Sequence, residues 1–277
     1  MAHITDWWNV SNSIWFGLSI RSKEKRCLEV LKMTVVKHII KNFSHQNQLN
    51  KEYVSTPPYP TLCLDNFIPL DTVRAMKAEC NSLHWDKEFT RAGSHMIEKS
   101  NIDECTIATD VKNQLSSATF LKWLGDITGH YDIIPDPYMV GAGYMRCGRG
   151  DSLKIHTDFN FNNELKLYRM LSLIIYLNED WQDEWNGDLQ FWDFEKQGCV
   201  SKYYPRAGRA VLWRYHRLGF HGHPKPVSCP EGIYRDGFRM FYYVSEQAGY
   251  KLDKTPHRSL YYYDSNTKEP YDISVEK

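Results

Sequence analysis

His156 and Asp158 are two metal-capable side chains that lie two residues apart in the stretch KIHTDFN, residues 154–160. Successive side chains of a β-strand point to opposite faces, so residues i and i+2 face the same way. An imidazole and a carboxylate at this spacing can therefore reach one point from the end of one strand. The pair would supply two ligands for a borderline metal ion.

A third ligand is available in FHGHPKPV, where either His221 or His223 could supply it. Two histidines and one carboxylate on one face of an octahedron form the facial triad of non-haem iron(II) oxygenases, which leaves positions open for a co-substrate and O₂. Zinc would prefer four-coordinate closure, and the sequence has no HExxH pattern. The ligand types therefore favour iron.

An oxygenase of this kind needs a source of electrons. If the source is 2-oxoglutarate, its distal carboxylate requires a cation in the pocket, and a bidentate arginine suits a carboxylate best. Arg235 and Arg239 lie downstream in YRDGFRMFYYV. They are four residues apart, so both would face one side of an uninterrupted strand, and the spacing alone leaves the choice open.

The elements that must position these residues change in character after Pro137. Before it, apolar spacing and capping residues predict helices over about 20–43, from Asp71 as N-cap to about Ser82, and from about Ser117 to Gly129. LCLDNFIP predicts a strand, residues 44–58 read as a polar linker, and residues 86–112 as an irregular region in which a substrate lid could lie.

After Pro137, short alternating or apolar runs follow one another closely, separated by loops with Gly, Asp, Asn and Pro. The runs are YMVGAGYMR, SLKIHTD, RMLSLIIYL, GDLQFWD, CVSKYYP, RAVLWRY and FRMFYYV. Several short strands at such intervals predict an antiparallel sandwich or barrel. We expect N-terminal helices to support one β-rich catalytic core.

Composition narrows the class of protein. The 277 residues contain 34 basic and 34 acidic side chains, so general electrostatic attraction to nucleic acid or an anionic membrane is not expected. The seven cysteines are scattered without a CxxC pair, which favours a reducing, cytoplasmic setting. No secretory signal and no run long enough to cross a bilayer is recognised.

The stretch from about 139 to 245 resembles 2-oxoglutarate/Fe(II)-dependent dioxygenases of the prolyl 4-hydroxylase type. The resemblance does not extend to residues 1–60. It is carried by several pieces in the family's order: GAGYM, LKIHTDFN, RMLSLIIYLNEDW, WNGDLQFWD, HGHPKPVSCPEG and YRDGFRMFYYV. Each piece alone is weak, whereas the ordered set is specific.

The resemblance implies roles for particular residues. By position, the iron ligands would be His156, Asp158 and His221, and His223 would lie near the metal without binding it. If His221 is not the third ligand, His223 is the alternative. Arg235 would anchor the distal carboxylate of 2-oxoglutarate because it stands six residues before the aromatic pair at Phe241, with Arg239 as the alternative. Tyr176 matches the tyrosine whose hydroxyl bonds the same carboxylate.

The resemblance also implies the fold and the reaction. The fold would be α+β and mainly β, a double-stranded β-helix (a cupin-like jelly roll) with N-terminal supporting helices. The reaction would hydroxylate an unactivated C–H bond with release of succinate and CO₂, using Fe(II), 2-oxoglutarate and O₂, with ascorbate to rescue oxidised iron. Asn186-Gly187-Asp188 departs from the Gly-Gly turn of many relatives, which puts little in doubt.

A peptidyl proline is the expected substrate, and a free amino acid or other small metabolite is the alternative. Nucleic-acid demethylation is disfavoured because the Asn-x-Tyr motif and the second arginine six residues after the anchor are missing. A non-catalytic cupin-like binding protein is disfavoured by the intact co-substrate anchor. We expect an N-terminal extension with an amphipathic helix (1–58), a dioxygenase domain (59–247, core about 139–245) and a polar tail (248–277).

Overall fold

The computed structural model describes residues 34–85, 87–91, 94–193, 195, 198–262 and 270–272. The expectations for residues 1–33 lie outside this part. The described α-helices are α2 (Thr34–Asn42), α3 (Gln46–Ser55), α4 (Leu70–Ser82), α5 (Thr106–Leu115) and α6 (Ala118–Thr128), and short 3₁₀ turns are η1 (Asp183–Trp185) and η2 (Glu246–Ala248). None of these helices is long and apolar enough to cross a membrane.

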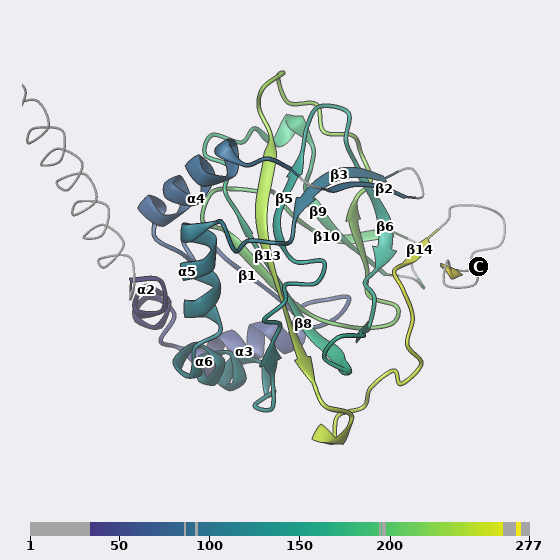
Figure 1. The fold of residues 1–277 in the computed structure, drawn as a ribbon. Helices are drawn as coiled ribbons and strands as arrows, with labels where there is room; N and C mark the ends of the chain where they lie inside the picture. Colours follow the sequence, from purple (N-terminus) through teal and green to yellow (C-terminus); the bar gives the residue numbers. More distant parts are fainter. Residues whose placement is uncertain are drawn as a thin grey trace, which may run out of the picture.

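The strands form two antiparallel sheets that face each other (Figure 1). In the described residues the larger sheet has the order β1-β11-β8-β13-β5-β3-β2, with β4 beside β13 and β7 beside β8, and the smaller has the order β10-β9-β12-β6-β14-β15. The strands of the larger sheet are β1 (Thr61–Leu64), β2 (Lys87–Arg91), β3 (Ser94–Lys99), β4 (Ile134–Pro135), β5 (Gly143–Cys147), β7 (Phe161–Asn162), β8 (Leu167–Tyr176), β11 (Ala210–Arg214) and β13 (Arg235–Val244). The strands of the smaller sheet are β6 (Leu153–Thr157), β9 (Leu189–Asp193), β10 (Gly198–Tyr203), β12 (Phe220–His223), β14 (Leu260–Tyr262) and β15 (Pro270–Asp272).

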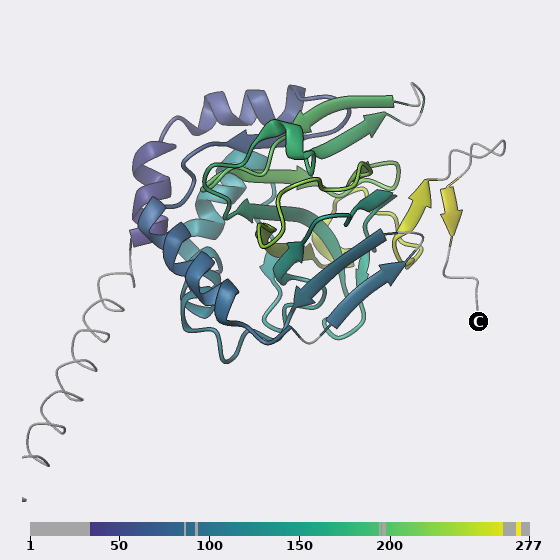
Figure 2. The same cartoon turned by 90° about the horizontal axis from the view of Figure 1, so that it is seen from above.

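The long strand β8 separates two hydrophobic cores because its side chains alternate between faces. Leu171 and Leu173 pack outward with the helices, whereas Ile174 and Tyr176 point inward, toward residues of the second sheet such as Phe191. Figure 2 shows the helices gathered on one side of the molecule and β14 and β15 at the other. The expected jelly roll with N-terminal supporting helices is confirmed.

Some local expectations are confirmed and others are wrong. Helix α6 has the expected ends: the Ser117 hydroxyl accepts the Phe120 N–H at 3.3 Å, and Gly129 is left-handed with φ +76°. Helix α4 instead begins at Leu70 with Pro69 at its N-cap, so Asp71 lies within the first turn.

Three polar stretches hold regular structure that the sequence analysis missed. The expected linker 44–58 contains α3, whose buried side chains, Leu49 and Tyr53, are one helical turn apart in an otherwise polar run. Residues 86–112 contain β2, β3 and the start of α5. Strand β3 escaped notice because its buried face carries a serine and a glutamate besides a methionine. The expected tail contributes β14, which pairs with β6.

Candidate metal and co-substrate site

The three expected iron ligands lie at the ends of two neighbouring strands. His156 in β6 stands opposite His221 in β12, and Asp158 follows β6. Ligand atoms of the three residues lie within 4.8 Å of one another. The Asp158 carboxylate oxygens are 3.8 Å from His156 Nε2 and 3.7 Å from His221 Nε2. Two imidazoles and one carboxylate form a donor set that suits Fe(II) with open positions.

Backbone carbonyls fix how both imidazoles are protonated. His156 Nδ1 donates to the Lys154 carbonyl at 2.8 Å, and His221 Nδ1 donates to the Gly219 carbonyl at 2.9 Å. A carbonyl only accepts, so the ring hydrogen of each neutral histidine lies on Nδ1. Nε2 therefore keeps its lone pair on the side of Asp158, where a metal would bind.

Burial and a buried arginine set the charges of the group. Burial, together with the neighbouring His221, lowers the pKa of His156 to about 4, so its imidazole is neutral near pH 7. Burial alone would raise the pKa of Asp158, but the Arg169 guanidinium and the neighbouring His221 and His156 together outweigh it and hold this pKa well below the ordinary range. The site thus offers a neutral imidazole at His156 and an ionised carboxylate at Asp158, which are the protonation states that metal binding requires.

Arg169 is a part of this site that sequence reasoning missed. Its Nη1 lies 2.8 Å from Asp158 Oδ2, and its guanidinium carbon lies 3.7 and 3.6 Å from the ring centroids of Phe159 and Phe241. The aromatic faces stabilise the cation where water is excluded. A lone arginine within the apolar strand β8 was the available signal.

His223, the alternative third ligand, lies apart from the cluster of three. It is fully buried, and its Nε2 lies 3.6 Å from Cys147 Sγ. Between the two histidines, Gly222 allows β12 to approach β6, because a Cβ at this position would lie 2.6 Å from the Leu153 carbonyl oxygen. The close approach positions His221 opposite His156.

Arg235 is the first residue of β13 and is 1% exposed. Its Nε donates to the Gly187 carbonyl at 2.6 Å, and its Nη2 donates to the Tyr176 hydroxyl at 3.0 Å. Its Nη1 is buried without a hydrogen-bond partner among the described residues. Because Tyr176 accepts from Arg235, its own hydrogen is left to donate. The pair therefore presents two donors, which fits the far carboxylate of 2-oxoglutarate.

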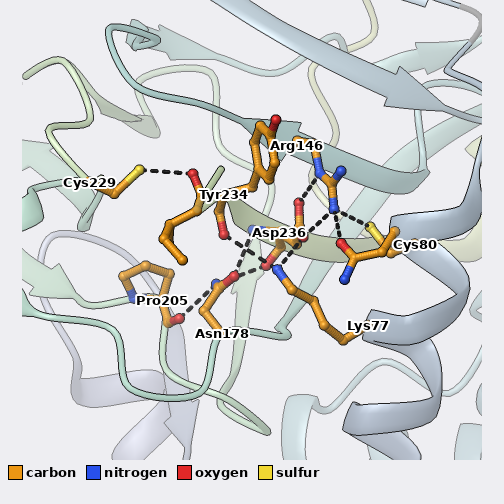
Figure 3. A network of polar contacts seen from close by, with 10 residues as sticks. Lys77, Cys80, Arg146, Asn178, Pro205, Cys229, Tyr234 and Asp236 are labelled. Atoms are coloured by element: carbon orange, nitrogen blue, oxygen red, sulfur yellow. Dashed lines mark hydrogen bonds and ion pairs between the residues drawn. The ribbon is translucent and has the colours of Figure 1, made fainter. Parts of the chain in front are cut away.

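The residue after Arg235 fixes the start of β13. Asp236 is fully buried and accepts from Arg146 at 2.7 and 2.8 Å and from Lys77, and its N–H donates to the Asn178 side chain at 2.8 Å (Figure 3). Lys77 of α4, Arg146 of β5 and Asn178 thus fix the position of Asp236. Because neighbouring side chains of a strand face opposite ways, fixing Asp236 outside the barrel aims Arg235 into it.

Arg239, the alternative anchor, lies elsewhere on the same strand. Its Nη2 pairs with Glu98 of β3, and both side chains line a cavity of about 580 Å³. His156 and Asp158 line the same cavity. Tyr261 of β14 also lines it and stacks on the His156 ring at 5.4 Å between centroids. The cavity therefore gives an outside molecule access to His156 and Asp158.

Comparisons with known proteins agree with this geometry. Residues 142–243 match a family model described as the 2OG-Fe(II) oxygenase superfamily, and no curated protein matches the sequence. An oxidoreductase of the 2OG-Fe(II) oxygenase family from Burkholderia pseudomallei is similar in structure at 12% identity, with a TM-score of 0.51 over 73% of this chain and 94% of its own. A prolyl 4-hydroxylase from Phytophthora capsici is similar at 16% identity, with a TM-score of 0.50 over 82% of this chain and 70% of its own.

Residues 142–243 thus match the 2OG-Fe(II) oxygenase superfamily. The protein is a 2-oxoglutarate- and Fe(II)-dependent dioxygenase with a fold like that of prolyl 4-hydroxylases. Fe(II) and 2-oxoglutarate are the cofactors that this match implies, and O₂ and a further substrate complete the reaction.

Proposed function

We propose that the protein hydroxylates a C–H bond with His156, Asp158 and His221 as its iron ligands. The observation that carries this proposal is the convergence of the ligand atoms within 4.8 Å, with both Nε2 lone pairs available. Bound Fe(II), with 2-oxoglutarate and O₂, supplies the oxidising power that converts the C–H bond to C–OH, with succinate and CO₂ as the other products. Ascorbate as a reductant of oxidised iron stays a prediction.

The chain's own contribution is to hold and orient. Arg235 and Tyr176 would bind the far carboxylate of 2-oxoglutarate through the unpaired Nη1 and the free hydroxyl hydrogen. Burial raises the pKa of Tyr176, so this hydroxyl stays protonated and able to donate. Holding one end of the co-substrate in a fixed, dry site orients the other end toward the metal ligands.

We propose a peptidyl proline as the first candidate substrate. Phe159 and Phe241 line the 580 Å³ cavity beside Asp158 and offer an apolar wall to a prolyl ring. The similarity to a protein described as a prolyl 4-hydroxylase is compatible with this substrate, although the fold by itself does not determine it.

A free amino acid or another small polar metabolite is the second candidate. The buried Glu98–Arg239 ion pair lies on the wall of the same cavity, and Glu164 and Arg258 line its exposed part. Positively and negatively charged side chains complement a small molecule that itself carries both a positive and a negative charge, and cavities of this volume usually bind small molecules.

Mass spectrometry of reaction mixtures decides between them. The full chain is incubated with Fe(II), 2-oxoglutarate and O₂ and with either proline-containing peptides or free amino acids, and products that gain one oxygen atom are sought. His156→Ala and Asp158→Ala should abolish both the product and the slow succinate formation seen without substrate. Succinate formation that persists in both variants would contradict the proposed iron site.

A further inference from the structure

A second cavity of about 390 Å³ is lined by residues of β8, the end of β11 and the segment 251–253. Its lining includes six residues with charged or titratable side chains: Arg169, Arg214, His216, Arg217, Lys251 and Asp253. The first cavity does not include any of these residues. The two cavities are therefore separate spaces.

The charges around this second cavity do not cancel. Arg217 pairs with Asp253 at 3.2 Å, and Arg169 pairs with Asp158. No hydrogen bond or ion pair within the described residues involves the side chains of Arg214 and Lys251. Two positive charges are left over, which matches a ligand with two negative charges better than a monoanion.

A neutral donor adds to these two charges. Leu218 donates its N–H to His216 Nδ1 at 3.1 Å, so the ring hydrogen of neutral His216 lies on Nε2, which can donate. Burial and the nearby Arg214 lower the pKa of His216, which keeps the ring neutral near pH 7.

The segment that supplies Lys251 and Asp253 is fixed to the barrel. The Asn160 amide donates to the carbonyls of Asp253 and Thr255, both at 2.9 Å, and its side-chain oxygen accepts the His257 N–H at 2.8 Å. Tyr168 donates its hydroxyl to the Lys254 carbonyl at 3.2 Å. These bonds preorganise the cavity wall, which lowers the entropic cost of binding a ligand.

We propose that this cavity binds a phosphate group, either as inorganic phosphate or as the phosphate of a monoester. Guanidinium groups recognise phosphate oxygens through paired hydrogen bonds, and the dianion balances the uncompensated charges of Arg214 and Lys251. The site is independent of which C–H bond is hydroxylated.

Isothermal titration calorimetry of the full-length protein tests this proposal. Inorganic phosphate is titrated in the presence of saturating 2-oxoglutarate, which occupies the Arg235 site. We expect one phosphate to bind per chain. In the double variant Arg214→Ala/Lys251→Ala the affinity for phosphate should fall by a factor of about ten or more, because two charged partners are lost.

A charge-matched double variant provides the control. Arg206→Ala/Lys254→Ala removes the same charge from exposed side chains that pair with Asp183 and Glu246 outside the cavity. This variant should bind phosphate like the unmodified protein. Equal loss in both double variants, or no phosphate binding by the unmodified protein at millimolar concentration, overturns the proposal.

Two further titrations distinguish the source of the phosphate. Tighter binding of methyl phosphate than of inorganic phosphate, lost in the Arg214→Ala/Lys251→Ala variant, assigns the cavity to an ester. The reverse order, with the same loss, assigns it to the free ion. Acetate that binds as tightly as either one contradicts recognition of a dianion.

Discussion

Replacing Arg235 with glutamine should weaken 2-oxoglutarate binding far more than it destabilises the fold. The side chain is 1% exposed, and it contacts the Gly187 carbonyl at 2.6 Å and the Tyr176 hydroxyl at 3.0 Å. Glutamine still offers an amide N–H to these partners. It cannot offer a positive charge to a carboxylate.

The magnitude follows from the burial of the anchor. Removing one partner of a buried, hydrogen-bonded charge pair costs about 2–5 kcal/mol of binding free energy. At 1.4 kcal/mol per tenfold change, the dissociation constant of 2-oxoglutarate should rise roughly 30-fold to several thousand-fold. The concentration of 2-oxoglutarate needed for half-maximal succinate formation should rise with it, provided that the assay reaches saturation.

Arg239→Gln is the matched control, since it removes the same charge from the same face of β13. Anaerobic calorimetry with Mn(II) in place of Fe(II) measures 2-oxoglutarate affinity without turnover, and thermal unfolding monitors the fold. We expect Arg239→Gln to change the affinity much less because that arginine pairs with Glu98. A larger loss of affinity in Arg239→Gln than in Arg235→Gln would refute the assignment of the anchor.

Gly187→Ala perturbs the same anchor without removing its charge. Gly187 has φ +75°, and a Cβ there would lie 2.9 Å from Arg235 Cδ. Left-handed backbone costs an alanine about 1–2 kcal/mol, and the contact must displace the arginine. We expect a lower melting temperature together with weaker 2-oxoglutarate binding. Unchanged affinity would mean that the position of Arg235 is not critical.

Three further outcomes test the site and its support. His221→Ala should abolish stoichiometric iron binding, measured by metal analysis after dialysis, whereas His223→Ala should retain it. Asp236→Asn should lower the free energy of unfolding in urea by about 3–5 kcal/mol, because two cations lose a fully buried partner. Burial lowers the pKa values of His130 and His156 from 6.5 to about 4, so the unfolded chain binds more protons between these values. The stability of the iron-free protein should therefore be complete above about pH 6.5 and fall as the pH drops toward 4, and a flat urea-unfolding profile over this window would contradict the burial of neutral imidazoles.

The sequence could predict the positions that strand periodicity controls. His156 and Asp158 share one side of a strand end, as period-2 alternation predicts, and their ligand atoms lie close to that of His221. Tyr176 and Arg235 point inward from neighbouring strands and contact each other. Arg235 contacts Tyr176 whereas Arg239 pairs with Glu98, and the choice of Arg235 as the anchor of 2-oxoglutarate stays a prediction.

The parts that sequence analysis missed depend on contacts between distant segments. Glu98 in β3 and Arg239 are 141 residues apart in the sequence, and sequence analysis did not predict that they form an ion pair. Tyr261 looked like part of a polar tail, and only the pairing of β14 with β6 places it on His156. Neither periodicity nor local propensity contains this information.

The 580 Å³ cavity is lined partly by residues of the family match and partly by residues outside it. His156, Asp158, Arg239 and Phe241 lie within residues 142–243, which match the family, whereas Met96, Glu98 and several residues between 256 and 261 lie outside that range. Mutations in these outer segments can alter which substrate is accepted while the proposed iron ligands and the proposed anchor of 2-oxoglutarate stay unchanged. Exchanging the β2–β3 hairpin and the 256–261 segment between relatives is therefore a direct way to engineer new selectivity.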